Sequence, residues 1–227
     1  CLHWGKAMPD TRTIQELIHQ VERGELTLPE FQRGYVWNRR QVSSLVTSLY
    51  HAHPTGHLLV WKTNNPTNLR GADAGDDHHT LVLIDGQQRL TSLYVLFYDK
   101  APAFWEGKNL HRGLCFNIVT EEFNWYHKTR MKGHPEWIDV HKFLSVSMPG
   151  LMANAEPNEK DLYNKNYENL YKLDGIKGYS HTVDQLSGEK FSMMESVVEV
   201  FNMVNSAGTR LSAADLAMAH LCTIWPE

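Results

Sequence analysis

The chain has 227 residues, 42% of them hydrophobic, which is enough for one large domain or two small ones with a packed core. Its formal net charge of −4 disfavours a protein that coats nucleic acid nonspecifically, because such domains are usually basic; Arg33, Arg39 and Arg40 are candidates for a local basic patch. No run approaches the roughly 18 apolar residues that span a bilayer, and no signal peptide is visible, so no membrane partner is expected.

Strand and helix patterns alternate through the first half of the sequence. A capping-box pattern at Thr13 and Glu16 precedes an amphipathic helix that begins at Ile14 and that Gly24 ends. The stretches 29–37 and 63–79 are predicted loops. Periodicity predicts further helices at 42–50 and 87–97, short strands at 26–28, 57–61 and 81–84, and a hairpin at 113–126.

Helical patterns dominate from Trp137 onward. We predict a helix that starts there, one helix over 158–172, and two more at 197–204 and 213–221 that flank a loop at 205–211. The predicted fold class is therefore α+β. A mixed sheet with flanking helices occupies residues 1–130, and a mostly helical region, residues 131–227, completes the domain.

The cysteines indicate where in the cell the protein is located, and the ends of the sequence indicate whether it is a fragment. The three cysteines are far apart and lack a C-x-x-C spacing, which indicates reduced thiols and a cytoplasmic location. Because the sequence begins with Cys and stops soon after a helical run, we expect a fragment that lacks a further C-terminal domain. Nothing in the sequence indicates an oligomeric state.

The stretch from Asp85 to Arg89 combines several features of an anion site. A buried strand that turns directly into a helix leaves unpaired backbone N–H groups at the turn, and the helix dipole adds partial positive charge there. Gly86 lets the backbone approach a ligand closely, and Arg89 carries a planar fork of donors that fits phosphate. Asp85 places a carboxylate where a metal ion or an attacking water can sit.

A purely structural interpretation of the same residues stays open. Asp85 can cap the helix, Gly86 can permit the turn, and Arg89 can pair with Asp85 four residues earlier. Gln87 and Gln88 favour a functional role, because adjacent glutamines are not preferred in a first helical turn and they direct amide groups toward the turn.

The loop from Gln32 to Trp37 has two interpretations as well. Arg33 lies between Gln32 and Gly34, so it can reach a phosphate without steric obstruction, and Tyr35 and Trp37 offer flat faces for a base or a sugar. Alternatively, the aromatic residues anchor the loop to the core while Arg33 pairs with an acidic neighbour. The spacing of these residues alone does not distinguish the ligand-binding interpretation from the structural one.

A third polar stretch follows the predicted helix at 197–204. In the structural interpretation, Asn205 belongs to a turn and Asp215 lies in the first turn of the next helix, where the helix dipole favours it. In the functional interpretation, Asn205 and Thr209 contact a nucleotide while Asp215 positions Arg33 or Arg89.

These segments resemble a known family. The run DGQQRLTSL at 85–93 is similar to the signature of GmrS-type domains, the N-terminal halves of GmrSD-type modification-dependent restriction systems. The blocks at 28–62 and 201–216 resemble two further blocks of that family, in the same order. The resemblance implies a ParB/sulfiredoxin-like fold, and it favours ligand contact for Gln32 and Arg33.

The resemblance implies a nucleotide-binding and nucleotide-hydrolysing domain of a DNA restriction or antiphage protein. The backbone N–H groups of Gly86, Gln87 and Gln88 would then bind phosphate, Arg89 would neutralise transition-state charge, and Asp85 would hold Mg²⁺ or orient water. Its partners would be a nucleoside triphosphate, a nuclease domain or subunit, and DNA through the full-length protein. The alternatives are a ParB-like DNA-binding or nuclease module and a catalytically silent nucleotide-sensing regulator.

Overall fold

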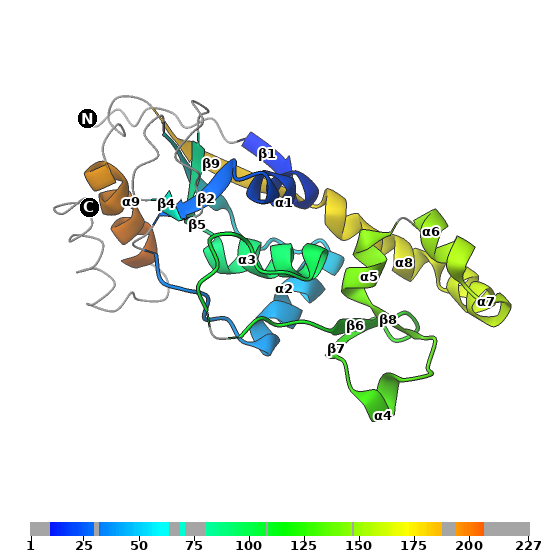
Figure 1. The fold of residues 1–227 in the computed structure, drawn as a ribbon. Coiled ribbons are helices and arrows are strands. Elements are labelled where there is room, and N and C mark those ends of the chain that lie inside the picture. The colour runs from blue at the N-terminus through cyan, green and yellow to red at the C-terminus, as the bar shows by residue number, and fades with distance from the viewer. Residues whose placement is uncertain are drawn as a thin grey trace.

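A mixed β-sheet has helices packed on both of its faces, and the short helices and a smaller sheet lie to one side of it (Figure 1). The computed structural model describes residues 10–29, 32–63, 69–70, 80–107, 109–146, 148–187 and 194–206. Within them, six strands pair in the order β1-β9-β3-β5-β2-β4. They are β1 (Asp10–Thr13), β2 (Leu26–Pro29), β3 (Leu58–Thr63), β4 (Leu69–Arg70), β5 (Thr80–Asp85) and β9 (Ser180–Leu186).

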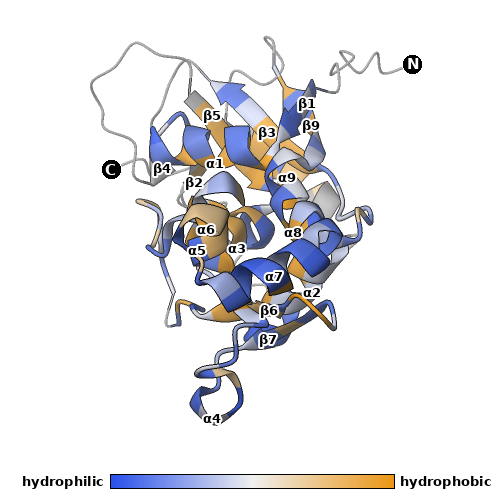
Figure 2. Cartoon of the chain, turned by 90° about the vertical axis from the view of Figure 1, so that its right-hand side faces the viewer, coloured by the Kyte–Doolittle hydropathy of each residue, from blue (hydrophilic) through white to orange (hydrophobic). Residues whose placement is uncertain are grey.

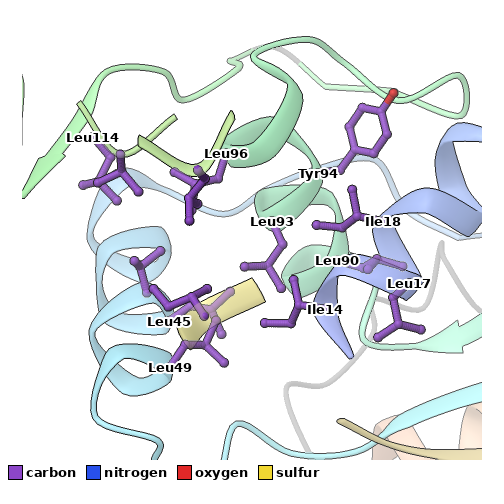
Figure 3. Packing of buried hydrophobic residues seen from close by; sticks show 14 of the residues in the cluster. Ile14, Leu17, Ile18, Leu45, Leu49, Leu90, Leu93, Tyr94, Leu96 and Leu114 are labelled. Carbon is purple, nitrogen blue, oxygen red and sulfur yellow. The ribbon is translucent and has the colours of Figure 1, made fainter. Parts of the chain in front are cut away.

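Three helices pack on one face of this sheet and a fourth covers the other. The first three are α1 (Ile14–Glu22), α2 (Arg39–Tyr50) and α3 (Gln87–Tyr98), whose apolar side chains face one another in Figure 3. Eight of the twelve residues of α3 are buried, so this helix is the centre of the larger core. On the opposite face α9 (Met194–Ser206) forms a second apolar cluster with residues such as Trp61 and Ile84.

A smaller sheet and a group of short helices extend from the far end of α3. Its strands β6 (Leu114–Asn117), β7 (Glu122–Trp125) and β8 (Trp137–Asp139) pair antiparallel in the order β7-β6-β8. The segment between β7 and β8 carries α4 (Lys128–Met131). The remaining elements are α5 (Val140–Ser145), α6 (Met148–Asn154), α7 (Pro157–Lys165), α8 (Tyr167–Asp174) and the 3-10 helix η1 (Gly175–Gly178).

Local sequence signals predicted most elements of the first half, although β1 was not predicted and β4 lies within the predicted loop at 63–79. The capping box is present, since the Thr13 hydroxyl accepts from the Glu16 N–H at 3.2 Å and the Glu16 carboxylate accepts from the Thr13 N–H at 2.7 Å. The predicted strand and helix around Gly86 are β5 and α3, and the predicted hairpin is the β6–β7 pair. The α+β class with a mixed sheet is confirmed, while the ParB-like relationship stays a prediction.

The second half departs from the prediction in four places. Trp137 lies in β8, opposite Asn117, and the helix begins at Val140 instead. The single helix predicted over 158–172 is two helices that meet at Asn166, whose side chain donates to the Leu162 carbonyl. The helix α9 continues through Asn205, which was predicted to begin a loop. Strand β9 was not predicted, and the helix predicted at 213–221 lies outside the described residues.

Strand β9 ties the two predicted regions into one sheet. It pairs antiparallel with β1 and parallel with β3, so residues 180–186 of the helical region are an inner strand of the N-terminal sheet. The boundary near residue 130 stays a prediction, and both sides of it contribute to the same sheet.

Two further sequence inferences can be placed in the structure. Cys115 is a free, buried cysteine, and burial raises the pKa of its thiol to about 11, which keeps it protonated at neutral pH. None of the helices in the described part of the chain combines the length and the apolar character needed to cross a membrane.

Replacing Gly86 with alanine should destabilise the fold more than replacing Gly24. Both glycines have positive φ, +101° and +72°, so alanine adds about 1–2 kcal/mol of backbone strain at each. At position 86 the new Cβ would also lie 2.2 Å from Cδ2 of Leu58, whereas nothing lies within 4 Å at position 24. This overpacking should add about 1–3 kcal/mol. Urea denaturation measures both losses, and equal losses would contradict the close packing at Gly86.

Candidate functional site

The turn between β5 and α3 presents the start of a helix without a side-chain cap. Gly86 occupies the N-cap position in the left-handed region, and no side chain from that position bonds the first N–H groups of the helix. The first N–H groups of any helix lack intrahelical acceptors and carry partial positive charge. Helix starts of this kind favour an anion where a ligand can reach them.

The side chain of Gln88 fastens the loop at 33–37 to this helix. Its carbonyl oxygen accepts from the backbone N–H of Val36 at 2.9 Å and of Trp37 at 3.2 Å. Its amide donates to the carbonyl of Gly34 at 3.3 Å. Both ends of the amide are thus used by one stretch of backbone, which explains structurally why a glutamine occupies the first turn of α3.

Two other glutamines make the same kind of link. The Gln32 amide is 3% exposed and donates to the carbonyls of Leu83 at 2.7 Å and of Ile84 at 3.0 Å, at the end of β5. The Gln87 amide donates to the carbonyl of Arg33 at 2.9 Å. The loop that carries Arg33 is therefore held to the strand and to the helix at the same time.

Tyr35 is packed into this assembly. Its hydroxyl lies 2.7 Å from that of Ser92 in α3, its ring centroid lies 5.1 Å from that of Trp105, and 9% of the residue is exposed. Burial raises the pKa of the phenol. The backbone N–H of Tyr35 donates to the Glu106 carbonyl at 2.6 Å. Its position is that of a loop anchor.

Arg89 connects α3 to the turn that precedes β3. One terminal nitrogen donates to the carbonyl of Thr55, and the other donates to that of His57 at 2.6 Å and to the Asp85 carboxylate at 3.3 Å. The side chain is 14% exposed, and burial lowers its pKa while the Asp85 charge opposes that shift. The ion pair four residues apart is the one that the structural interpretation of the motif proposed.

Three polar residues that the sequence analysis did not single out lie beside this motif. His57 Nδ1 is 3.1 Å from a carboxylate oxygen of Asp184 in β9, and His181 Nδ1 is 3.3 Å from the Gly56 carbonyl. Asp184 and Asp85 both pair in register with Leu59, on its two sides. The two histidine contacts each span more than 100 residues of sequence, so no local signal could have found them. In the structure, burial partly alternates along 180–186, as is typical of a strand.

A cavity of about 420 Å³ opens between α2 and the turn held by Arg89. Its wall combines two guanidinium groups, several hydroxyls and an aromatic ring, and the Thr55 hydroxyl oxygen is buried there without a hydrogen-bond partner in the described structure. The lining residues are Trp37, Arg40, Gln41, Ser44, Leu45, Ser48, Pro54, Thr55 and Arg89.

Arg40 is the exposed cation of this cavity. It lies in the first turn of α2, next to Arg39, and that turn contains no acidic residue. A cation at a helix N-terminus is unfavourable because of the helix dipole. Among the described residues Arg40 makes no ion pair, whereas Arg39 lies 5.2 Å from the ring centroid of Trp125. The position of Arg40 is suited to a bound anion.

The structure does not bring all of the predicted site residues together. The Arg89 guanidinium shares the cavity with Arg40, and Arg33 is not among its lining residues, so convergence of Arg33 with Arg89 stays a prediction. Asn205 lies in α9, and Thr209 and Asp215 lie outside the described residues.

The donor set around Asp85 can be compared with the needs of Mg²⁺. No group of three or more His, Cys, Asp or Glu side chains in the described part of the chain is arranged to hold a metal ion. Mg²⁺ usually takes one or two carboxylates together with phosphate and water. Asp85 is 41% exposed and fits the role of a single carboxylate ligand to an ion that arrives with a phosphate.

Comparison with known proteins identifies related sequences. The model of the family described as GmrSD restriction endonuclease, N-terminal domain, matches residues 14–222. An uncharacterized protein of Methanocaldococcus jannaschii is 36% identical over 243 aligned residues, which cover 92% of this chain and 41% of that protein. The chain thus spans about two fifths of the length of this relative. The family match confirms the resemblance inferred from the three sequence blocks.

Protonation of His181 should destabilise the fold in mild acid. Burial lowers its pKa below the ordinary value of about 6.5, with Arg89 and His57 adding to the shift. The unfolded chain then binds a proton more readily than the folded one, so stability falls as the pH decreases from about 6.5 toward the folded pKa.

Urea denaturation between pH 5 and 8 tests this expectation. The variant His181→Asn should show a weaker loss of stability on acidification than the wild-type protein. The matched control is His19→Asn, because His19 is an exposed histidine on α1, and its pH dependence is compared with that of His181→Asn. An identical pH dependence in both variants would contradict the prediction.

Proposed function

This chain belongs to the family of GmrSD restriction endonuclease N-terminal domains, and on that premise we propose that it binds and hydrolyses a nucleoside triphosphate. The family associates the chain with restriction and defence. In the proposal, nucleotide occupancy regulates a nuclease domain or subunit of the longer protein, which acts on DNA.

The observation that carries the proposal is the cavity shared by Arg40 and Arg89. Their two guanidinium groups supply charge-assisted donors for a phosphate chain. Trp37 supplies an aromatic face for the base at the same opening. Arg89 is already fixed by two backbone carbonyls, so it loses little further freedom when a ligand binds.

The helix start next to this cavity supports phosphate binding. Arg89 belongs to the first turn of α3, whose N–H groups receive no side-chain cap from Gly86. In this proposal Gly86, Gln87 and Gln88 bind phosphate through their backbone. The side chains of Gln32, Tyr35 and Gln88 act indirectly, because their bonds to the loop and to β5 set the shape of the opening.

Asp85 is the proposed catalytic carboxylate. It lies at the end of β5, adjacent to the helix start, and its partial exposure leaves it accessible to water. In this role it orients the attacking water and contributes a ligand to Mg²⁺, which would neutralise phosphate charge when bound. Arg89 stabilises the charge that develops on the transferred phosphoryl group.

A catalytically silent nucleotide sensor is the second candidate. The observation in its favour is the ion pair between Asp85 and Arg89, which engages the proposed catalytic carboxylate with a structural cation. Both candidates require nucleotide binding, and they differ in whether phosphate is released.

The variant Arg40→Ala should weaken nucleotide binding. Loss of a charge-assisted contact costs about 1.5–3 kcal/mol, which corresponds to a roughly 10- to 100-fold rise in Kd. Isothermal titration with a non-hydrolysable triphosphate and Mg²⁺ measures this change. The matched control is Arg39→Ala, which removes the neighbouring charge from Trp125 and not from the cavity. Equal affinity in both variants would remove Arg40 from the binding site.

The variant Asp85→Asn should retain nucleotide affinity and lose turnover. Phosphate release is measured for the four common triphosphates, with and without Mg²⁺, in parallel with the titration. Binding without release in the wild-type protein would select the silent sensor, and absence of both would overturn the proposal. Arg89 is a poor probe here, because its removal also frees the turn that contains Thr55 and His57.

A further inference from the structure

The segment that connects β7 to β8 leaves the body of the molecule. It comprises residues 126–136 and is called the basic projection here. Its short helix α4 lies apart from the other elements in both Figure 1 and Figure 2, which view the chain from directions 90° apart. Such a segment can enter the groove of a partner or lie along its surface without hindrance from the rest of the chain.

The basic projection is folded by its own contacts. Met131 is buried, and its sulfur accepts from the backbone N–H of His127 at 3.3 Å. The N–H groups of Arg130 and Met131 both donate to the His127 carbonyl, at 3.1 and 3.0 Å. At its base the Tyr126 N–H donates to the Gly113 carbonyl at 2.8 Å. The turn therefore presents its exposed side chains on a defined backbone.

The charges of the projection are mainly positive. Lys128, Arg130 and Lys132 are exposed, and none of them forms an ion pair within the residues that the structure describes. Glu136 is the one carboxylate in the sequence 126–136, and it pairs with His134 at 3.1 Å. Three unpaired cations within five residues stand out in a chain whose formal net charge is −4.

Such a cluster is unfavourable in the isolated chain. Lys128 and Lys132 are four residues apart, a spacing at which like charges on a helical turn repel one another. A polyanion removes that repulsion, and the release of its condensed counterions adds a favourable term. We propose that the basic projection binds the phosphate backbone of duplex DNA.

The side chains around the cations favour a duplex over other polyanions. Proteins that bind single strands use aromatic platforms on which bases stack, and Tyr126, 54% exposed, is the one Phe, Tyr or Trp residue of the projection. Membrane-surface segments insert apolar side chains, and Met131 is directed into the protein instead. Lysine and arginine side chains on a narrow turn are suited to phosphates on a regular lattice.

The test compares two triple variants of the full-length protein. Lys128→Gln, Arg130→Gln and Lys132→Gln together remove the charge of the projection. Lys62→Gln, Lys160→Gln and Lys165→Gln together remove the same charge from β3 and α7. Fluorescence anisotropy with a labelled 30-base-pair duplex is recorded from 50 to 200 mM salt.

The projection variant should bind DNA at least tenfold more weakly at 50 mM salt than the wild-type protein or the control variant. The slope of log K against log salt should decrease in magnitude by about 2.7, as expected for three lost phosphate contacts. Phosphate release in the absence of DNA should be unchanged, so this result is independent of the proposed nucleotide site.

Three outcomes would overturn the inference. The first is an equal loss in both triple variants, which would assign the effect to net charge. The second is unchanged DNA affinity in the projection variant, or no DNA binding by the wild-type protein at 50 mM salt. The third is a loss of binding to phosphatidylserine vesicles or single-stranded RNA while duplex affinity is retained.

Discussion

The candidate site depends on how a buried guanidinium group is satisfied. Arg89 donates to two backbone carbonyls of the turn before β3 and to the Asp85 carboxylate, so one side chain fixes the positions of three segments. A Cβ at Gly56 would lie 2.8 Å from one of its terminal nitrogens, which shows how closely that turn approaches. A buried cation without these acceptors would be costly, so the turn and the arginine determine each other's position.

In the motif from Asp85 to Arg89, the structural roles and the proposed chemical roles belong to different atoms. The side-chain amides of Gln87 and Gln88 hold the loop that carries Arg33, while their backbone N–H groups lie in the first turn of α3, where we propose that phosphate binds. The side-chain bonds agree with the structural interpretation of the sequence, and the functional interpretation stays a proposal. The ion pair between Asp85 and Arg89 belongs to the first interpretation, and the cavity beside Arg89 belongs to the second.

The first turn of α2 lies between the cavity and the strand that precedes the basic projection. Arg40 lines the cavity, while its neighbour Arg39 covers Trp125 of β7 and accepts a hydrogen bond from that indole at 3.2 Å. The strand β7 leads directly into the basic projection. A shift of this turn would therefore move a residue of the cavity and also alter the packing of β7, which leads into the basic projection.

Local sequence patterns predicted many of the helices and strands, whereas the candidate site depends on contacts between residues that are far apart in the sequence. The capping box at Thr13, the strand–helix turn at Gly86 and the hairpin at 113–126 are encoded by neighbouring residues, and all three were predictable. From the sequence, Arg40 could be recognised only as a cation in a possible basic patch. Its place in a cavity with Arg89 depends on how α2 packs against a turn that is distant in sequence. Trp137 was placed in a helix because its pairing with β6 has no local signal.

The position of β9 has a consequence for how the chain acquires its fold. Within the described residues β1 pairs with β9 alone, and β3 reaches β1 only through β9, so this side of the sheet cannot close before residues 180–186 are available. During synthesis, β1 and β3 would lack their partner β9 until more than 100 further residues have emerged. Pairings so distant in sequence slow folding and expose strand edges in the interim. A nascent chain of this protein is therefore expected to need protection from aggregation until residues 180–186 have been translated.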